Sequence, residues 1–231
     1  MFPEDFPITR KWPAQSPELL QLYSFPTPNG VKVSIALEEM EIPYEAHRVP
    51  LGDAYVRSPE FLSLSPNNKI PAIIDPNGPE GETVALFESG AILIYLAEKT
   101  GKLMPPSGAG KYEVIKWLMW QMGGLGPMLG QLGYFHKFAG REIEDPRPRD
   151  RFVTEGKRLL NVINGQLEGK DWVTGEFSIA DIAIAPWLNS VFFYEAQDLL
   201  GWEDFANLQP YLDRFFARPA VIRGRTIPAA D

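Results

Sequence analysis

The chain has 231 residues, and its 45% hydrophobic and 23% charged residues are typical of a folded globular protein rather than a disordered one. The formal net charge is −8 and no block of lysines or arginines occurs, which argues against a surface for nucleic acid or anionic membranes. No cysteine is present, so disulfides, thiolate metal sites and thiol chemistry by the protein itself are excluded. The two histidines, His47 and His136, lie far apart in the sequence, and we expect no metal site.

The usual sequence signals for a membrane or for export are also missing. The longest apolar run, AILIYLA at 91–97, is far shorter than the roughly 20 residues that span a bilayer. The N-terminal stretch MFPEDFPITRKWP contains acids and prolines and no apolar core of a signal peptide. We therefore predict a cytoplasmic protein that makes no membrane contact.

The first half of the chain alternates between strand and helix patterns after a proline-rich arm at 1–18, in which we expect Trp12 to dock against the protein. The predicted strands span 19–25, 44–49, 70–75 and 83–88, and the predicted helices span 30–41, 58–66 and 89–101. The last two strands form a hairpin across PNGPEGE, and Ser89 is the predicted N-cap of the helix that follows. The order β-α-β-α-β-β-α predicts an α/β unit with a mixed four-stranded sheet over 19–101.

The second half is mostly helical. KLMPPSGAG at 102–110 is rich in proline and glycine and reads as a linker between two domains. The predicted helices beyond it span 111–137, 149–168, 177–188 and 208–221. The fold class is therefore α/β followed by all-α, with the helical domain over 111–231.

One helix start carries a strong local signal. In FSIADI, Ser178 is a predicted N-cap and Asp181 stands three residues later, as in a capping box. Phe177 and Ile182 occupy the positions of a hydrophobic staple. We interpret this motif as structural rather than catalytic.

Two other motifs allow a structural and a functional interpretation. The Ile70–Pro71 bond precedes a strand, and from local sequence a trans bond is favoured, although a cis bond would turn backbone N–H and C=O groups toward an extended peptide ligand. Glu88 and Ser89 stand at a helix start, where free N–H groups attract a carboxylate and Glu88 can pair with an ammonium group. That pair suits the head of an α-amino acid, whereas the simpler interpretation is a capped helix with a solvated acid.

Taken in this order, the motifs TPNG, SPNNKIPAI, LFESGAI, WQMGGLGPMLGQ and FSIADIAIAPW resemble the cytosolic glutathione transferase superfamily. Within it, TPNG, SPNNKIPAI, LFESGAI and WQMGGLGPMLGQ are similar to the nu-class bacterial enzymes, also described as glutathione-dependent disulfide-bond reductases. The resemblance covers about residues 20–225. It implies a thioredoxin-like N-terminal domain that binds glutathione, an all-helical C-terminal domain and a homodimer.

The resemblance also implies roles for individual residues. Thr27 and Asn29 match the residues that face the glutathione thiol, and Arg151 matches an arginine that helps bind glutathione. The other matching positions are Lys69 near the glycyl end, Ile70 pairing through its backbone, a cis Pro71, and Glu88 with Ser89 at the γ-glutamyl head. One position departs from the pattern, because Val56 stands about where members often carry a glutamine near the glycyl carboxylate.

The FPTPNG stretch at 25–30 is then expected to activate the thiol of glutathione. Thr27 and Asn29 can each donate a hydrogen bond to the sulfur, and such a bond to a charged group contributes about 1.5–3 kcal/mol. One bond of this strength would lower the thiol pKa by about one to two units. Tyr23 and Ser24 are rival hydroxyls, and a plain turn with Asn29 capping the helix is the structural alternative.

The expected reaction is attack of the glutathione thiolate on a small disulfide. Conjugation to an electrophile, a non-catalytic glutathione-binding regulatory module, and an isomerase or lyase-coupled transferase of aromatic degradation remain alternatives. The glycines at 123, 124, 126 and 130 either widen a pocket for two glutathione molecules or allow close helix packing. Aromatic residues on the same long helix line either the pocket or the core: Trp117, Trp120, Tyr134, Phe135 and, beside them, His136.

Overall fold

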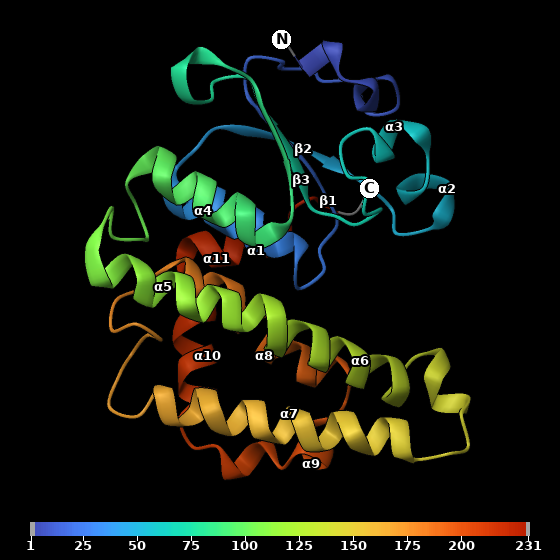
Figure 1. Ribbon diagram of the computed structural model, residues 1–231, viewed down its shortest axis with the longest axis vertical. Helices are drawn as coiled ribbons and strands as arrows, with labels where there is room; N and C mark the ends of the chain where they lie inside the picture. Colours follow the sequence, from blue (N-terminus) through green and yellow to red (C-terminus); the bar gives the residue numbers. More distant parts are fainter. Residues whose placement is uncertain (1–2, 230–231) are drawn as a thin grey trace. The chain divides into compact units, whose positions relative to one another are not determined.

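The computed structural model describes residues 3–229 (Figure 1). They divide into two compact units. The first comprises the chain up to Leu103 together with the residues from Pro219 onward, and the second is Met104–Arg218. Within the described range, none of the helices combines the length and hydrophobicity that crossing a bilayer requires.

The first unit is built around a four-stranded sheet in the order β2-β1-β3-β4. Its elements are β1 (Leu20–Ser24), α1 (Gly30–Met40), β2 (Tyr44–Arg48), α2 (Asp53–Val56), α3 (Pro59–Leu62), β3 (Ala72–Asp75), β4 (Val84–Phe87), α4 (Ser89–Thr100) and α11 (Pro219–Gly224). β1 pairs in parallel with β2 and antiparallel with β3, which in turn is antiparallel to β4. The predicted mixed four-stranded sheet is therefore confirmed.

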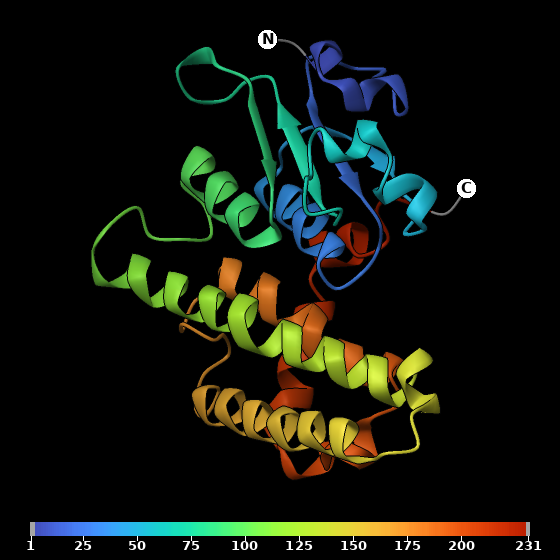
Figure 2. The ribbon, with the colours of Figure 1, turned by 45° about the vertical axis from the view of Figure 1, so that its right-hand side comes forward.

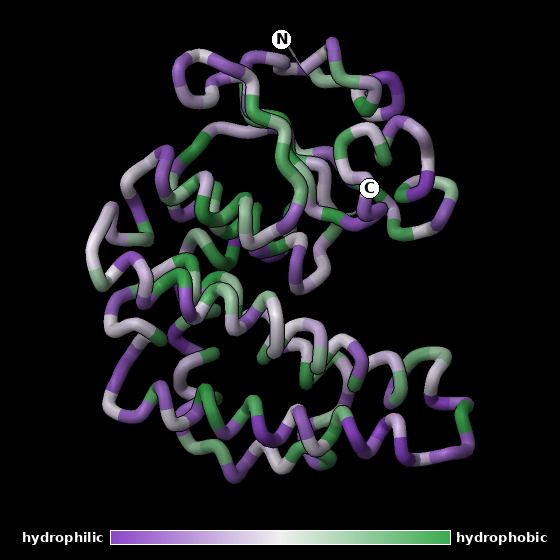
Figure 3. The backbone as a smooth tube through the Cα atoms, viewed as in Figure 1, coloured by the Kyte–Doolittle hydropathy of each residue, from purple (hydrophilic) through white to green (hydrophobic). Residues whose placement is uncertain are grey.

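The sheet is covered on both faces, and the side-chain alternation of its strands explains how. Tyr23, Ala72 and Ile74 lie in one core cluster with residues of the N-terminal arm and of α2 and α3. α1 and α4 lie side by side, and Figures 1 and 2 show both on one side of the strands. The strands are short, and β3 and β4 are the most apolar of them, whereas β2 carries Glu45, His47 and Arg48. The hydropathy colouring of the backbone is shown in Figure 3.

The N-terminal arm docks against the first unit, as expected for Trp12. The Trp12 indole Nε1–H donates a hydrogen bond to the Arg48 carbonyl oxygen at 3.0 Å. The backbone N–H groups of Gln15 and Ser16 donate to the Glu45 carboxylate at 2.8–3.0 Å. Ile8, in a short 3₁₀-helix of the arm, is completely buried in the core cluster. The arm is therefore part of the folded unit.

The second unit is helical. Its elements are α5 (Gly108–Trp120), α6 (Gly126–His136), α7 (Arg147–Gln166), α8 (Ile179–Phe193), α9 (Gln197–Leu200) and α10 (Leu208–Phe216). A π-helical segment at Gln121–Leu125 joins α5 to α6, so the predicted long helix is interrupted at its glycine-rich stretch. Along α7, hydrophilic and hydrophobic residues alternate (Figure 3), and Leu159, Leu160 and Ile163 form its buried side.

The capping box predicted at the start of α8 is present. The Ser178 Oγ accepts a hydrogen bond from the Ala180 N–H at 3.3 Å, and the Asp181 carboxylate accepts one from the Ser178 N–H at 2.9 Å. The carboxylate also accepts bonds from the Val173 N–H and the Tyr211 hydroxyl, so Asp181 joins three segments of the second unit.

The last predicted helix is wrong in its extent, because 208–221 forms two helices. α10 ends at Phe216, and α11 begins at Pro219, since proline disfavours the helical conformation of the residue before it. α11 packs on α1, where the Ser34 hydroxyl donates to the Gly224 carbonyl oxygen at 2.7 Å and Arg223 pairs with Glu38. Residues from 219 onward therefore belong to the first unit, although the sequence placed them in the helical domain.

Candidate functional site

The strand register gathers the sequence-predicted site residues of the first unit at one end of the sheet. Tyr23 of β1 lies opposite Ala72 of β3, which lies opposite Phe87 of β4. The carboxyl ends of β1 and β4 and the amino end of β3 therefore meet. The segments that follow or precede these ends hold Thr27, Asn29, Lys69, Ile70, Pro71, Glu88 and Ser89. α1 and α4 both begin at this end, so their N–H groups and dipoles are directed toward it.

Thr27 is half-buried in the turn between β1 and α1, and its hydroxyl is oriented by the backbone. Thr27 Oγ1 accepts a hydrogen bond from the Gly30 N–H at 3.1 Å, and the Thr27 carbonyl oxygen accepts one from the Val31 N–H at 3.0 Å. A hydroxyl has two acceptor lone pairs and one proton. Because Thr27 Oγ1 serves as acceptor toward Gly30, its proton can be donated to a ligand atom.

Asn29 and Gly30 complete this turn. Asn29 is half-buried and occupies the N-cap position of α1, as the structural alternative expects, but its side chain makes no capping hydrogen bond. Gly30 is required sterically, because a Cβ at this position would overlap the Phe25 carbonyl oxygen and crowd the Ser24 hydroxyl. The close approach brings the start of α1 against the end of β1.

The rival hydroxyls are both completely buried. Tyr23 stacks on His47 with 4.6 Å between ring centroids, and its hydroxyl finds no hydrogen-bond partner among the described residues. Burial raises the pKa of the Tyr23 hydroxyl far above its usual value. The negative charge of Glu45 raises this pKa further, by a smaller amount. Ser24 Oγ lies 3.5 Å from the Phe25 carbonyl oxygen. Of these three hydroxyl-bearing residues, Thr27 is the one that is partly exposed to solvent.

The Ile70–Pro71 peptide bond is cis, as the family resemblance implies and contrary to the local expectation of a trans bond. Both side chains are buried, so a ligand can reach only the backbone here. Lys69 is exposed just before them, and the Ser65 hydroxyl donates to the Lys69 carbonyl oxygen at 2.7 Å. This bond closes the loop that presents Lys69 and Ile70.

Glu88 and Ser89 differ from the predicted helix cap. Ser89 is the first residue of α4 rather than its N-cap, and Glu88 takes the cap position without a side-chain capping bond. Glu88 has a φ of 75°, which is uncommon for a residue other than glycine and is typical of functional sites when packing imposes it. Its carboxylate is exposed, whereas Ser89 is buried beside it.

The sequence analysis missed Lys32, which lies below this pair. Lys32 is completely buried in α1, and its Nζ donates to Ser89 Oγ at 3.3 Å. Burial lowers the pKa of the Lys32 ammonium to about 7, partly opposed by the negative charge of Glu88. The available signal was its place in VKVSIAL, where apolar residues on both sides leave α1 little polar surface.

The position on α2 that the family resemblance assigns to the glycyl end of glutathione carries an apolar side chain. Val56, at the position where a glutamine is usual, is 7% exposed and belongs to the core cluster with Ile8 and Phe61. It therefore packs rather than binds. The nearby Asp53 and Arg57 form an exposed ion pair with 3.1 Å between Oδ1 and Nε.

Arg151 belongs to the second unit. It is exposed on α7 and lines a cavity of about 500 Å³ with Met128, Phe152, Thr154 and Glu155. Phe135 stacks on Phe152 with 5.5 Å between centroids, so one of the predicted pocket aromatics supports this cavity.

The remaining candidates on α5 and α6 differ in their surroundings, and Gly123 has open space where a Cβ would lie. Gly126 lies against Trp187 and Gln121, where a Cβ would clash, so this glycine permits close helix packing. Trp117 is buried and contacts Trp120 edge to face, Tyr134 is exposed, and His136 Nε2 lies 3.3 Å from the Glu195 carbonyl oxygen.

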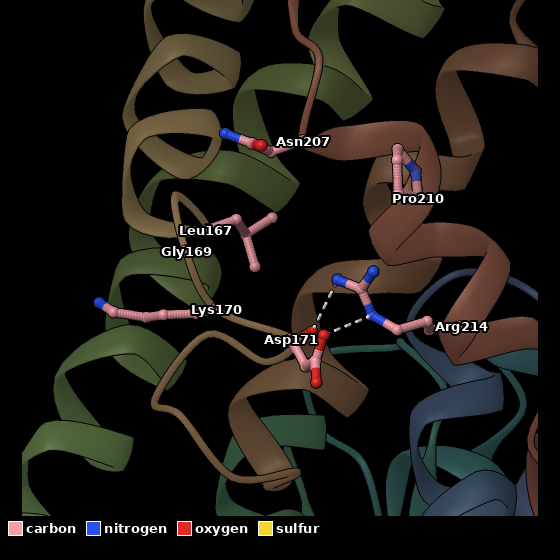
Figure 4. Close-up of a pocket in the computed structure, with 7 residues that line it drawn as sticks. All are labelled: Leu167, Gly169, Lys170, Asp171, Asn207, Pro210 and Arg214. Carbon is pink, nitrogen blue, oxygen red and sulfur yellow. Dashed lines mark hydrogen bonds and ion pairs between the residues drawn. The ribbon is translucent and has the colours of Figure 1, made fainter.

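A smaller cavity of about 300 Å³ lies between the end of α7 and α10 (Figure 4). Arg214 faces Asp171 across it, and its Nη2 donates to the Asp171 carbonyl oxygen at 3.1 Å. None of the sequence-predicted site residues lines it. Across residues 3–229, no group of three or more histidine and acidic side chains is arranged to hold a metal ion.

Comparison with known proteins identifies the family of both units. Residues 27–99 match the family described as glutathione S-transferase, N-terminal domain, and residues 128–219 match glutathione S-transferase, C-terminal domain. The disulfide-bond oxidoreductase YfcG of Escherichia coli is 48% identical over 174 residues, which cover 74% of this chain and 80% of that protein.

Two solved structures are similar over nearly the whole chain. A glutathione transferase from Burkholderia graminis, with two glutathione molecules bound per subunit, is 61% identical with a TM-score of 0.97 and covers 99% of this chain and 96% of its own. A glutathione transferase from Pseudomonas putida, with one glutathione disulfide bound per subunit, is 59% identical with a TM-score of 0.97 and covers 99% and 100%. The fold, the gathered loops and these matches together show that the chain belongs to the glutathione S-transferase family.

Proposed function

We propose that this protein is a glutathione-dependent disulfide-bond reductase. In this proposal Thr27 donates the principal hydrogen bond to the glutathione sulfur and Asn29 donates a second. The Ile70 backbone pairs with the cysteinyl part, Pro71 shapes that backbone, and Lys69 lies near the glycyl end. Glu88 and Ser89 hold the γ-glutamyl head, and Arg151 is a further ligand for glutathione.

The chemistry follows from the absence of cysteine, because both reducing sulfurs must then come from glutathione. A first glutathione thiolate attacks one sulfur of the substrate disulfide, a mixed disulfide forms, and the other substrate sulfur leaves as a thiolate and takes up a proton. A second glutathione thiolate attacks the glutathione sulfur of the mixed disulfide. Glutathione disulfide forms and the second substrate thiol leaves, so two thiols are oxidised as one disulfide is reduced.

The role of the protein is to supply thiolate at neutral pH. The Thr27 hydroxyl, oriented by the Gly30 N–H, donates to the sulfur, and the start of α1 adds partial positive charge. A charge-assisted hydrogen bond of about 1.5–3 kcal/mol lowers a thiol pKa by about one to two units. The thiol of glutathione is thereby ionised to a larger extent at pH 7.

The observation that most supports disulfide exchange is the content of the related structures. The Burkholderia graminis protein holds two glutathione molecules and the Pseudomonas putida protein holds one glutathione disulfide. These are the reducing pair and its oxidised product. The name of the YfcG relative points to the same reaction.

The test is steady-state reduction of a small disulfide, hydroxyethyl disulfide, by glutathione with the purified protein, coupled to glutathione reductase. Conjugation of glutathione to a chlorodinitrobenzene is measured in parallel. We expect rapid disulfide turnover and slow conjugation. Strong conjugation with slow disulfide turnover would instead favour a general transferase, and neither activity with retained glutathione binding would favour a regulatory module.

We further infer that the protein works in the cytoplasm as a homodimer. The support is the resemblance to the cytosolic glutathione transferase superfamily. Light scattering coupled to size exclusion is expected to give twice the monomer mass. A monomer mass at micromolar concentration would contradict this part of the proposal.

A further inference from the structure

Lys32 is a charged residue in an unusual place. Its side chain is 0% exposed in α1, between the apolar Val31 and Val33. Lysine is almost never fully buried unless its charge is paired, because removing an ammonium group from water is costly. The structure therefore keeps an ionisable amine at a position where the flanking sequence would accept an apolar residue.

The ammonium group is directed to the start of α4. Lys32 Nζ lies 3.3 Å from Ser89 Oγ, and the charge of Glu88 acts on it. An ammonium group only donates, so Ser89 Oγ is the acceptor of this bond and the Ser89 proton is directed elsewhere. Lys32 thereby orients the hydroxyl at the first position of α4.

Other charged groups on the elements that pack against α1 have contacts of their own. On α11, Arg223 pairs with Glu38 of α1, and near the end of α4 Lys99 pairs with Asp75. α4 also carries Glu98 in its last turn, and β1 contains no Asp, Glu, Lys or Arg. Glu88 is thus the acid at the α4 start that faces Lys32.

We propose that Lys32 is a positioning residue for the γ-glutamyl end of glutathione, whose buried ammonium orients Ser89 and supplies positive charge toward the bound α-carboxylate. This inference rests on the proposed function, because it assumes that glutathione binds at Glu88 and Ser89. It adds a residue that does not lie on the exposed surface of the site.

Binding of a carboxylate near Lys32 changes the number of protons that the protein holds. In the ligand-free protein burial lowers the pKa of Lys32 to about 7, so the group is partly neutral at neutral pH. A carboxylate placed near it favours the charged form and raises this pKa. Binding of glutathione therefore takes up a fraction of a proton near and above neutral pH, and the uptake declines toward zero at acid pH, where Lys32 is mostly charged before binding.

The experiment is isothermal titration calorimetry at pH 7.5 in buffers of different ionisation enthalpy, which reports the number of protons exchanged on binding. The ligand is S-methylglutathione, because it has no thiol proton to release. Two analogues dissect the head group: the S-methyl glutaryl peptide keeps the carboxylate and lacks the amine, and the S-methyl 4-aminobutanoyl peptide lacks the carboxylate and keeps the amine. A second titration series at pH 5.5 gives the acid limit.

The variants are Lys32→Met, which keeps an unbranched side chain one atom shorter and removes the charge, and Lys102→Met as the matched control. Lys102 is a partly exposed lysine of the same unit, paired with Glu41. We expect Lys32→Met to bind S-methylglutathione about tenfold or more weakly and to lose the proton uptake, and Lys102→Met to behave as wild type.

The inference is supported if wild type takes up protons with S-methylglutathione and the glutaryl peptide, but not with the aminobutanoyl peptide. Binding by wild type without uptake, or uptake that persists in Lys32→Met, would overturn it and leave the proposed function in place. Failure of wild type to bind S-methylglutathione at all would overturn the proposed function as well. The comparison of the two peptides uses wild type alone, so it decides the matter even if Lys32→Met does not fold.

Discussion

At the scale of single residues, Thr27 has a structural role in the turn and, in the proposed function, a chemical one. Its Oγ1 accepts from the Gly30 N–H, which satisfies one of the free donors at the start of α1. The same bond orients the hydroxyl so that its proton is available to a ligand. The turn is thus organised before any ligand binds, and little reorganisation is needed to hold a thiolate.

The first prediction concerns that hydroxyl. Thr27→Val keeps the shape of the side chain and removes the donor, so we expect disulfide reduction to slow at least tenfold, because one charge-assisted hydrogen bond of about 1.5–3 kcal/mol is lost. Thr27→Ser keeps the hydroxyl and is the matched control, expected to retain most of the activity. The measurement is kcat and the pH profile of kcat/KM, whose acid limb should move to higher pH in Thr27→Val. An unchanged rate would assign the principal role to Asn29 or Ser24.

The second prediction tests the rejection of Tyr23 as the activating hydroxyl. Its hydroxyl is buried without a hydrogen-bond partner among residues 3–229, and an unsatisfied buried hydroxyl destabilises the folded state. Tyr23→Phe is therefore expected to leave disulfide turnover within about twofold and to increase the free energy of unfolding by up to about 1 kcal/mol. Activity and urea denaturation are measured on the same preparation. A tenfold loss of turnover in a stable variant would return Tyr23 to the site.

At the scale of elements, the start of α8 shows how one side chain joins several segments. The buried Asp181 carboxylate accepts hydrogen bonds from the Ser178 and Val173 N–H groups and from the Tyr211 hydroxyl. Burial nonetheless raises the pKa of Asp181 to about 6, and the hydrogen bonds lower it in part. The capping box that the sequence revealed is therefore also a link in the core of the helical unit.

The third prediction follows for Asp181→Ala, which leaves these donors buried without an acceptor. We expect a loss of about 2–4 kcal/mol in the free energy of unfolding, because each orphaned donor costs about 1–3 kcal/mol and partial relaxation reduces the sum. Asp53→Ala is the control, since Asp53 forms an exposed ion pair that contributes little. Denaturant unfolding measures both. A change below 1 kcal/mol in Asp181→Ala would show that the links are not important for stability.

The N-terminal arm gives the fourth prediction. Ile8 is completely buried in the core cluster, whereas Ile222 of α11 is 54% exposed. Ile8→Ala should lower the free energy of unfolding by about 2–5 kcal/mol, because it leaves a cavity, and Ile222→Ala should change it by less than about 1 kcal/mol. Thermal and denaturant unfolding compare the two. Equal effects would mean that the arm is only loosely attached in solution.

At the scale of the whole molecule, the absence of cysteine determines where the sulfur chemistry takes place. In the proposed function every reducing equivalent passes through glutathione, and the protein contributes hydrogen bonds, charge and a binding surface. Domain organisation follows the family, with the site residues of the sheet end in one unit and Arg151 in the other.

The fifth prediction tests whether the reducing sulfur belongs to glutathione and not to the protein. Treatment of the protein with iodoacetamide at neutral pH, followed by removal of the reagent, should leave disulfide reduction unchanged, because the chain offers no thiol to alkylate. A cysteine-dependent oxidoreductase treated in the same way is the positive control and should lose its activity. Loss of activity here would reveal a reactive group that the sequence does not predict.

Much of the fold was predictable because its signals are local. Apolar periodicity and turn residues located the strands, and the Ser178–Asp181 spacing located the start of α8. The predictions failed where packing between distant segments decides. α11 departs from the predicted last helix to pack on α1, and the π-helical segment interrupts α5–α6 where Gly126 meets Trp187.

In the candidate site, too, the sequence predicted local features better than contacts between distant segments. The family resemblance predicted which loops carry the site residues. The strand register brings these loops to one end of the sheet. Ser89 as an N-cap was wrong by one residue, because the cap position is taken by Glu88 at a positive φ. Lys32 was missed, since its burial under Ser89 arises from contacts between α1 and α4 that are separated by more than 50 residues.

The sequence by itself determined that the protein carries no thiol, that an α/β unit precedes a helical one, and that a hydroxyl and an amide stand before α1. Only the tertiary structure decided which hydroxyl is accessible, placing Tyr23 and Ser24 inside the core and Thr27 at the surface. It also decided that a lysine lies beneath the start of α4. The reason is physical: residue type and periodicity act over one or two turns, whereas burial and electrostatics depend on which distant segments share the space around a side chain.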